Sequence, residues 1–337
     1  MQTIDLVRLD GLSDAFARPI RYLRVSVTDK CNLRCVYCMP EGGLPWLRRD
    51  EILSYEEIGR VVEAAASVGV HSIRLTGGEP LLRRNLEQLV ALIAATPGID
   101  DIALSTNGLL LEEQIDALVA AGLRRVNVSL DTLQPQRFES IARRPGLERV
   151  LRAIDCAVAR GLFPVKINCV VMRGRNDDEV EAFAEFSRRL PVAVRFIEAM
   201  PVVEYAEAQR EEYVSADELL EHLRAIGDLR PVEGPRGNGP ARYFAFPGAA
   251  GTIGVITPLS HDYCDRCNRI RLTADGRLRL CLFGDYHVDL RAPLRAQATR
   301  DDLVAILRRS MLIKPERHHL RLGEPASRMR ALSEIGG

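Results

Sequence analysis

The sequence predicts an α/β protein whose core is an incomplete, TIM-like (β/α)6 barrel, followed by a C-terminal appendage. Strand-like and helix-like segments alternate from about residue 22 to residue 200, which is the pattern of βαβ units with parallel strands. Only six strand candidates are present, whereas a complete barrel needs eight. A doubly wound open sheet is the alternative fold for the same alternation.

The six strand candidates are short segments rich in aliphatic and β-branched residues. They cover residues 22–28, 72–77, 101–107, 125–131, 165–171 and 194–200. Helical patterns lie between them, at residues 54–69, 85–96, 112–122, 147–161 and 178–190. The first helical pattern begins with Ser54 and Glu57, an S-x-x-E capping box that marks a helix N-terminus.

Apolar and polar residues alternate within the strands, so one face of the predicted sheet is polar. Arg24, Arg74, Asn127 and Lys166 share that face, while their neighbours in the sequence are mostly aliphatic. Parallel strands packed on both faces are normally apolar throughout, and closed barrels have apolar interiors. We therefore expect an open, wet barrel interior that binds a polar, anionic ligand. The alternative is that these are solvent-exposed strand faces at a sheet edge.

The chain divides into a barrel region at residues 1–205 and a C-terminal region at residues 206–337. The second region is irregular and contains a Pro/Gly-rich loop at residues 231–240, a helical pattern at residues 300–312, and a Gly-Gly end. We expect it to be an appendage on the barrel rather than an independent fold.

Composition and charge narrow the classes of function. The chain contains 46 basic and 46 acidic residues, and this balance argues against general nucleic-acid binding, which needs a basic surface. The N-terminus has no apolar signal core, and the apolar runs are too short to span a membrane. We expect a cytoplasmic protein with no membrane partner. In the reducing cytoplasm, clustered cysteines indicate metal binding or catalysis rather than disulfides.

A first cysteine triplet follows the first strand directly, at the rim where barrel enzymes have their active sites. Cys31, Cys35 and Cys38 have C-x3-C-x2-C spacing, and no fourth cysteine or histidine lies nearby in the sequence. A structural zinc site normally has four protein ligands. A [4Fe–4S] cluster normally takes four cysteines, so three thiolates would leave one iron open for another ligand. Zinc remains the alternative here.

A second triplet, in the C-terminal region, is also one ligand short. Cys264, Cys267 and Cys281 have C-x2-C-x13-C spacing. On spacing alone, a zinc site completed by His261 or His287 is an open alternative. The His318-His319 pair near the C-terminus is expected to lie in a solvated turn.

Three features of the sequence resemble the radical S-adenosylmethionine (SAM) enzymes: the first triplet after the first strand, Tyr37 before its third cysteine, and "GGEP" at residues 77–80. Nearly the whole chain, through "CNRIRLTADG" to the terminal Gly-Gly, is similar to the GTP 3′,8-cyclase family of these enzymes. The resemblance implies two [4Fe–4S] clusters, the first binding SAM and the second contacting GTP. Ala17, where this family is expected to have glycine, and Tyr263, where phenylalanine is common, are small departures.

The resemblance also implies which residues serve each ligand. SAM contacts are expected at Tyr37, Gly78, Ser129 and Met200. GTP contacts are expected at Arg24, Arg74, Thr106, Lys166, Arg269, Ile270 and Arg271. Catalytic roles are expected for Arg269, Arg271 and the terminal Gly336 and Gly337, which would reach the active site.

The implied reaction opens molybdenum-cofactor biosynthesis. A 5′-deoxyadenosyl radical from SAM would remove the C3′ hydrogen of GTP, and the C3′ radical would attack C8 of guanine. A further electron and proton would then give 3′,8-cyclo-7,8-dihydro-GTP. The implied partners are a reductant such as flavodoxin, the downstream cyclic pyranopterin monophosphate synthase, and a second copy in a homodimer. Two other functions remain open: another radical SAM enzyme with an auxiliary cluster, such as a peptide-modifying maturase, and a non-enzymatic, zinc-stabilised interaction module.

Overall fold

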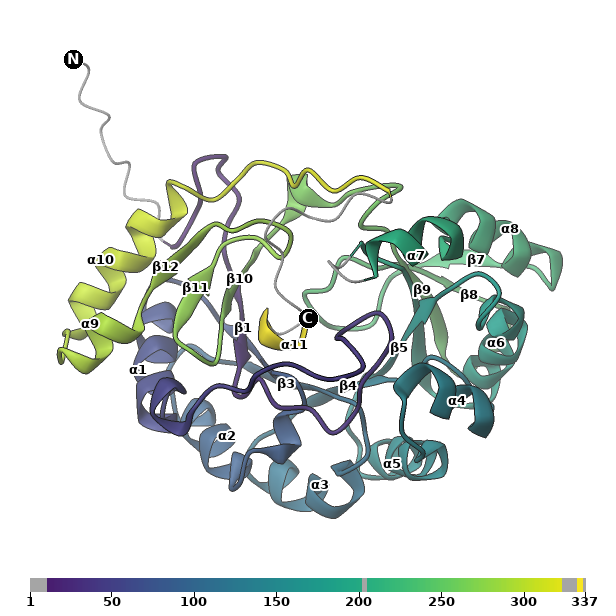
Figure 1. Cartoon of the computed structure of the whole chain (residues 1–337), viewed down its shortest axis with the longest axis horizontal. Coiled ribbons are helices and arrows are strands. Elements are labelled where there is room, and N and C mark those ends of the chain that lie inside the picture. The colour runs from purple at the N-terminus through teal and green to yellow at the C-terminus, as the bar shows by residue number, and fades with distance from the viewer. Residues whose placement is uncertain (1–10, 202–204, 323–331, 336–337) are drawn as a thin grey trace.

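Six parallel strands in sequence order form the central wall of the protein, seen in a computed structural model that describes residues 11–201, 205–322 and 332–335. They curve around a central space, with the helices that connect them on the outside (Figure 1). The strands are β1 (Tyr22–Ser26), β2 (Ser72–Thr76), β3 (Asp101–Thr106), β4 (Arg125–Ser129), β5 (Val165–Val171) and β6 (Val192–Glu198). Because their order never reverses, the sheet is wound in one direction, which excludes the doubly wound alternative.

The helices between these strands cover the outer face of the wall. They are α1 (Tyr55–Ala66), α2 (Leu86–Ala94), α3 (Leu111–Ala120), α4 (Pro135–Ala142), α5 (Leu147–Ala159) and α6 (Val180–Arg189). The capping box predicted at the start of α1 is confirmed. The Glu57 amide donates to Ser54 Oγ at 3.2 Å, and the Ser54 amide donates to Glu57 Oε2 at 2.7 Å.

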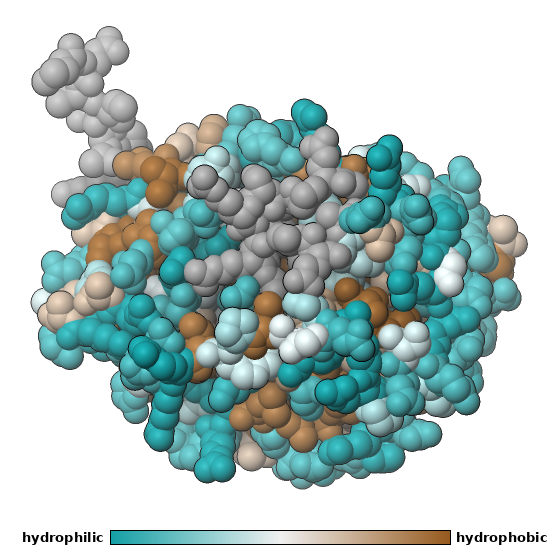
Figure 2. Space-filling view, viewed as in Figure 1, coloured by the Kyte–Doolittle hydropathy of each residue, from teal (hydrophilic) through white to brown (hydrophobic). Residues whose placement is uncertain are grey.

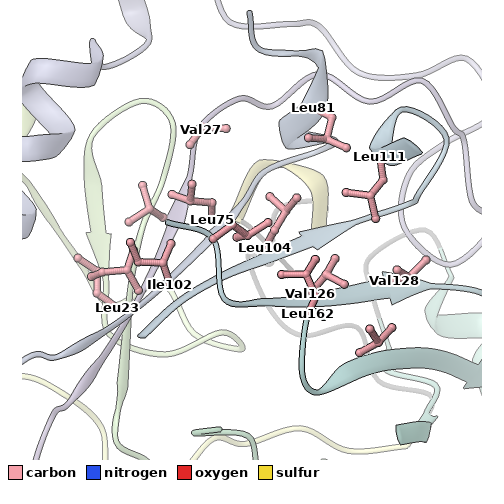
Figure 3. Close-up of a cluster of buried hydrophobic side chains, with 14 of the residues drawn as sticks. Leu23, Val27, Leu75, Leu81, Ile102, Leu104, Leu111, Val126, Val128 and Leu162 are labelled. Carbon is pink, nitrogen blue, oxygen red and sulfur yellow. The ribbon is translucent and has the colours of Figure 1, made fainter. Parts of the chain in front are cut away.

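The aliphatic residues of the strands form the core between wall and helices. Figure 3 shows Leu23, Leu75, Leu104 and Val126 among them, and all four are fully buried. Burying one such side chain stabilises the fold by about 1.5–3 kcal/mol. Because side chains alternate along a strand, this apolar outer face leaves the intervening polar residues on the inner face.

The C-terminal region adds strands to both edges of the wall. At one edge β10 (Arg269–Leu272) pairs in parallel with β1, and β11 (Arg277–Arg279) and β12 (His287–Asp289) follow in antiparallel order. At the other edge β9 (Thr252–Ile256) pairs in parallel with β6, followed by β8 (Arg242–Ala245) and β7 (Arg230–Val232). The region expected to be irregular therefore continues the sheet. The domain boundary at residue 205 stays a prediction.

The remaining elements lie around the wall and within its opening. They are α7 (Ala206–Glu212), α8 (Ala216–Ala225), α9 (Arg291–Arg295), α10 (Arg300–Met311), α11 (Leu332–Ile335) and the 3-10 helices η1 (Arg49–Glu51), η2 (Pro80–Leu82), η3 (Asp177–Glu179) and η4 (Cys264–Arg266). The helix predicted at residues 300–312 is confirmed by α10, which packs on α1. The short α11 lies inside the arc of strands (Figure 1), and Gly336 and Gly337 lie outside the described residues.

The face seen in Figure 2 is mostly hydrophilic, with separate apolar patches, one of them below the middle of the view. Among the described residues, none of the helices has both the length and the apolar character that a membrane span requires.

Candidate active site

A first pocket lies at the carboxyl ends of β1 to β4, with the first cysteine triplet in its wall. Its lining includes Cys31, Cys35, Cys38, Tyr37, Thr76, Gly77, Gly78, Ser105, Thr106, Asn107, Ser129, Asp131, Leu332 and Ser333. The structure thus brings three of the four residues expected at SAM, Tyr37, Gly78 and Ser129, to the cysteines. The fourth, Met200, is not among the lining residues of this pocket and instead packs against α11.

The glycines after β2 allow two loops to meet at this pocket. The Gly78 amide donates to the Thr28 carbonyl at 2.8 Å, across the two loops that leave β1 and β2. A Cβ on Gly78 would lie 2.3 Å from the Lys30 carbonyl oxygen, and a Cβ on Gly77 would lie 2.5 Å from that of Thr28. Only glycine permits this approach, which holds the "GGEP" loop against the segment carrying the cysteines.

The carboxylate of Glu79, the acidic residue of "GGEP", is used inside the protein. It accepts hydrogen bonds from Thr106 Oγ1 at 2.8 Å, the Asn107 amide at 2.7 Å and the Leu81 amide at 3.0 Å. Burial raises the pKa of Glu79 to about 7 despite these donors. Its role is to tie the ends of β2 and β3 together. Thr106, expected at GTP, is therefore placed in the first pocket with its hydroxyl occupied.

The thiols of the first triplet lie in surroundings that disfavour negative charge. Burial raises the pKa of Cys38 to about 12 and places that of Cys35 well above its usual value, with the Asp131 carboxylate adding to the effect. Burial also raises the pKa of Asp131 to about 6, and this carboxylate accepts a 2.7 Å hydrogen bond from Tyr37 Oη. Coordination to metal is what makes such thiols thiolates. The donor set of three half-buried thiols fits an iron–sulfur cluster.

Helix α11 connects the first pocket with the second. Leu332 and Ile335 pack against Tyr37, Cys38 and Met200 from one side of the opening, and against Leu282 and Phe283 from the other. Ser333 lies beside the Cys38 thiol and partly offsets the effect of burial on its pKa. The last described turn of the chain therefore lies between the two cysteine triplets.

The second triplet lines its own pocket beside β10. The lining residues are Tyr263, Cys264, Cys267, Arg269, Arg271, Leu280, Cys281, Leu282, Phe283 and His318. The expectation that His318 lies in a solvated turn is wrong, because its ring packs edge-on against Phe283 with centroids 4.9 Å apart. The histidines of the zinc alternative have other partners. His261 Nε2 lies 2.9 Å from Asp217, and His287 Nδ1 lies 2.9 Å from the Asp285 carbonyl.

Buried cations surround this second triplet. Burial raises the pKa of Cys267, but Lys314 and Arg269 outweigh it, and the net shift is downward. Lys314 Nζ lies 3.5 Å from Cys267 Sγ. Arg18 donates to the Cys264 carbonyl at 2.6 Å from behind the pocket. The three thiols, with space in front of them, fit a cluster that leaves one position for a further ligand.

Arginines from three neighbouring strands stand side by side inside the barrel. In the sheet register Arg24 of β1 lies between Arg74 of β2 and Arg271 of β10. Burial, together with the neighbouring arginines, lowers the pKa of Arg24 to about 9 and that of Arg271 to about 10. Arginine stays protonated in proteins, so these shifts express the energetic cost of crowding buried cations. A polyanionic ligand would relieve that cost.

Lys166 of β5 and Arg195 of β6 are two further cations of the barrel interior. Together with Arg24, Arg74 and Arg271 they form what is called here the cationic set. Burial, followed by the charges of Arg195 and Arg125, lowers the pKa of Lys166 to about 6. Within the described residues, buried nitrogens of Arg195 (Nε), Arg269 (Nε) and Arg271 (Nη1) have no hydrogen-bond partner. The sequence reasoning missed Arg195, although it follows the inward alternation of its strand. Ile270, expected at GTP, has its side chain in the core, so only its backbone faces the site.

The Pro/Gly-rich loop at residues 231–240 provides hydrogen-bond acceptors for Lys166 and Arg125. Lys166 Nζ donates to the Arg236 carbonyl at 3.0 Å, and Arg125 Nη1 donates to the same oxygen at 3.2 Å. Arg125 also pairs with the buried carboxylate of Asp101. Gly237 has φ +142°, and a Cβ there would lie 2.5 Å from Arg125 Nη1. The glycine thus lets the loop close on the cationic set.

Comparison with known families gives matches over most of the chain. Residues 25–187 match the Radical SAM superfamily, and residues 192–320 match Molybdenum Cofactor Synthesis C. The GTP 3′,8-cyclase of Pelotomaculum thermopropionicum is 49% identical over 327 residues, covering 97% of this chain and 100% of that protein. The GTP 3′,8-cyclase of Heliobacterium modesticaldum is 48% identical over 325 residues, covering 96% of this chain and 99% of that protein.

Solved structures provide a likeness in fold. Streptococcus suis SuiB bound to the precursor peptide SuiA superposes with a TM-score of 0.58 at 13% identity, covering 87% of this chain and 68% of that chain. The same protein bound to S-adenosylmethionine gives a TM-score of 0.56 at 14% identity, covering 86% and 68%. These neighbours support the partial-barrel architecture.

Proposed function

The chain belongs to the GTP 3′,8-cyclase family of the radical SAM superfamily, and we propose that its reaction takes place inside the barrel, between the two cysteine triplets. The enzyme converts GTP to 3′,8-cyclo-7,8-dihydro-GTP in the first step of molybdenum-cofactor biosynthesis, using SAM and [4Fe–4S] clusters. The assignment of individual residues to these ligands is our proposal.

The first pocket binds SAM. Cys31, Cys35 and Cys38 hold the first cluster, and Tyr37, Gly78 and Ser129 line the space beside it. When bound, the cluster and SAM supply an electron and a 5′-deoxyadenosyl radical. The chain's own contribution here is orientation: Asp131 fixes the Tyr37 hydroxyl, and Gly78 lets the loop after β2 approach the cysteine segment.

The second pocket and the barrel interior bind GTP. Cys264, Cys267 and Cys281 would hold the second cluster, which would supply a position for a further ligand such as the guanine base. Arg24, Arg74, Lys166, Arg195, Arg269 and Arg271 receive the triphosphate, because guanidinium groups suit phosphate oxygens geometrically and electrostatically. No G-x4-G-K-[ST] loop occurs in the sequence, so side-chain cations replace the usual phosphate-binding loop.

The observation that carries this assignment is the crowding of buried arginines at the second triplet. The lowered pKa of Arg24 and Arg271 and the unpartnered nitrogens of Arg195, Arg269 and Arg271 indicate a site built for a highly charged anion. A pocket evolved for a peptide would not need this charge.

Anaerobic purification followed by an activity assay tests the proposal. We expect a brown protein with about eight irons, four for each cluster. With reductant and SAM, it should convert GTP to the cyclised nucleotide, detected by mass spectrometry. A reconstituted protein with about eight irons that cleaves SAM but leaves GTP unchanged would favour a different radical SAM activity. A colourless protein with stoichiometric zinc would favour the interaction module.

We propose that the C-terminal glycines act at the same site. Gly336 and Gly337 lie outside the described residues, but they follow α11, which already packs between the triplets. Glycine lacks a Cβ and tolerates any backbone angle, so such an end suits a crowded pocket. We expect their amides to position GTP beside Arg269 and Arg271.

Deleting only Gly336 and Gly337 tests the role of the end of the chain. Iron content and SAM binding should remain, while formation of the cyclised nucleotide should fall severely. Turnover of GTP at the full-length rate would show that these glycines have no catalytic role.

Chemistry and resemblance support the remaining partners. Reductive SAM cleavage needs a one-electron donor of low potential, for which a flavodoxin is suitable. The cyclised nucleotide must be consumed by a further enzyme, cyclic pyranopterin monophosphate synthase. We place the reaction in the cytoplasm, where a reducing environment keeps thiols available for clusters. The homodimer rests on the resemblance to the family.

A further inference from the structure

Lys314 is a buried cation that contacts the second cysteine triplet and is not among the residues that line its pocket. It follows α10 and is only 3% exposed. Its Nζ donates to the Leu280 carbonyl at 2.6 Å and lies 3.5 Å from Cys267 Sγ. Because Leu280 directly precedes Cys281, a single ammonium group connects the segment that carries Cys267 with the segment that carries Cys281.

The use of lysine at this position is chemically specific. Of the 46 basic residues in the chain, only Lys30, Lys166 and Lys314 are lysines. A lysine ammonium is a compact point charge on an unbranched stem, whereas a guanidinium is a broad planar fork. The compact ammonium of Lys314 reaches both a sulfur and a carbonyl oxygen with one nitrogen.

The charge of Lys314 differs from the charge of the other cation behind the pocket. Arg18 holds the Cys264 carbonyl, but its guanidinium is paired with Asp14 at 2.6 Å. In the part of the chain that the structure describes, no salt bridge joins Lys314 to a carboxylate. Its positive charge therefore acts on the sulfur beside it rather than on an acidic partner.

We propose that Lys314 is a positioning residue for the second [4Fe–4S] cluster, which holds Cys267 and the Leu280–Cys281 segment in place and raises the reduction potential of that cluster. The proposal rests on the assignment of Cys264, Cys267 and Cys281 as cluster ligands. A charge-assisted hydrogen bond to a ligating sulfur stabilises the more negative, reduced state of a cluster. Among the described residues of the first triplet no side-chain cation contacts a thiol sulfur in this way: Arg34 donates to the Cys31 carbonyl at 2.7 Å, and the carboxylates of Asp131 and Glu79 raise the pKa of Cys35 and Cys31.

An anaerobic redox titration followed by electron paramagnetic resonance tests this role. The reconstituted enzyme is compared with Lys314→Met, which keeps an unbranched side chain but removes the charge, and with Lys314→Arg, which keeps the charge. A Cys35→Ala sample, lacking the first cluster, assigns the signal of the second. We expect the midpoint potential of the second cluster to become more negative in Lys314→Met and to stay closer to wild type in Lys314→Arg.

Two controls test whether the change in potential comes from Lys314 alone and is confined to the second cluster. Arg266 lies next to Cys267 in the sequence, but its side chain is 74% exposed, so Arg266→Met removes a solvated charge and should leave both potentials unchanged. The first cluster should keep its potential in every variant. A general loss of packing would alter both clusters, whereas the proposed role alters only one.

The outcomes separate this proposal from the proposed function. Selective loss of the second cluster from Lys314→Met, with retention in Lys314→Arg, supports the holding role. An unchanged potential in Lys314→Met with full iron content overturns the proposal. Equal loss of the cluster from Lys314→Met and Lys314→Arg also overturns it, because charge would then not be the cause. A wild-type protein that assembles only one cluster would instead refute the assignment of the ligands.

Discussion

The two cysteine triplets have the same number of thiols, but the charges beside Cys35 and Cys267 differ in sign, while burial raises the pKa of Cys264 as it does in the first triplet. In the first, burial raises the pKa of all three thiols, and the carboxylates Asp131 and Glu79 add to the rise for Cys35 and Cys31. In the second, burial raises the pKa of Cys267 but Lys314 and Arg269 outweigh it. The same barrel thus contains one pocket with carboxylates near its thiols and one pocket with cations near its thiols.

This difference shows how a set of three cysteine ligands can serve two purposes, the cleavage of SAM and the binding of GTP. Negative surroundings disfavour the reduced state of a cluster and make it a stronger reductant, which suits the cleavage of SAM. Positive surroundings attract an anion and suit the binding of GTP. The environment of each cluster, rather than the cysteine spacing, indicates its role.

Removing one cysteine from each triplet should have the largest effect and would separate the two roles. Cys35→Ala should abolish reductive SAM cleavage, because the first cluster binds SAM. Cys267→Ala should leave some uncoupled cleavage and remove GTP cyclisation. Liquid chromatography of 5′-deoxyadenosine and cyclised nucleotide measures both products. Complete loss of SAM cleavage in a folded Cys267→Ala protein that retains the first cluster would break the comparison.

Removing single arginines should sharpen the assignment of the anionic ligand to the second pocket. Arg24→Ala or Arg271→Ala should cost roughly 1.5–3 kcal/mol in GTP binding, or about 10-fold to 150-fold in Kd. SAM binding should change much less. Arg152→Ala is the matched control, since this arginine is 56% exposed and pairs with Glu112 on the surface. Equal losses for both ligands in calorimetric titrations would contradict the assignment.

The pH dependence of GTP binding should report the charge of Lys166. Its pKa of about 6 makes it neutral above that pH in the absence of GTP, and a bound triphosphate would favour its protonated form. GTP binding should therefore take up a proton and weaken as pH rises above about 6, by at most about tenfold per pH unit. Lys166→Met should lack this component, while titration of GTP itself is common to both proteins. Parallel pH profiles for the two would exclude the effect.

The smallest expected effect concerns the turn that places Arg18 behind the second triplet. Ala17 is exposed and has φ +59°, a left-handed conformation that disfavours residues with a Cβ. Ala17→Gly should therefore raise the free energy of unfolding by about 0.5–1 kcal/mol in anaerobic urea titrations. Ala15→Gly, in the same turn without positive φ, should lower it. Equal effects from the two variants would show that backbone conformation is not the cause.

The wall of the barrel could be predicted from the sequence because the patterns that mark its strands and helices involve residues that are close together in the chain. Alternation placed Arg24, Arg74 and Lys166 on the inner face, and the same rule applied to β6 would have found Arg195. The capping box at Ser54 predicted the start of α1 for the same reason. The cysteine spacings located both triplets, while resemblance, rather than geometry, supplied the ligands.

Other features of the site depend on contacts between distant parts of the chain. β10 lies beside β1 although it comes near the end of the sequence, and its short Arg-rich segment has little strand character. Lys314 and His318 reach the second triplet from beyond α10, where no local pattern marks them. Thr106 was expected at GTP from a motif match, but its bond to Glu79 could be found only in the folded protein.

The pairing of β1 with β10 has a consequence for how the protein is made. During synthesis, β1 emerges early and its partner β10 emerges late, so the edge of β1 stays open until most of the chain has left the ribosome. Open strand edges are sites of aggregation, and contacts between distant segments form slowly. The fold is therefore completed after translation rather than during it. Loss of the segment after β9 would leave an unsatisfied edge beside the first cysteine triplet, so such truncations should yield aggregates rather than partial enzymes.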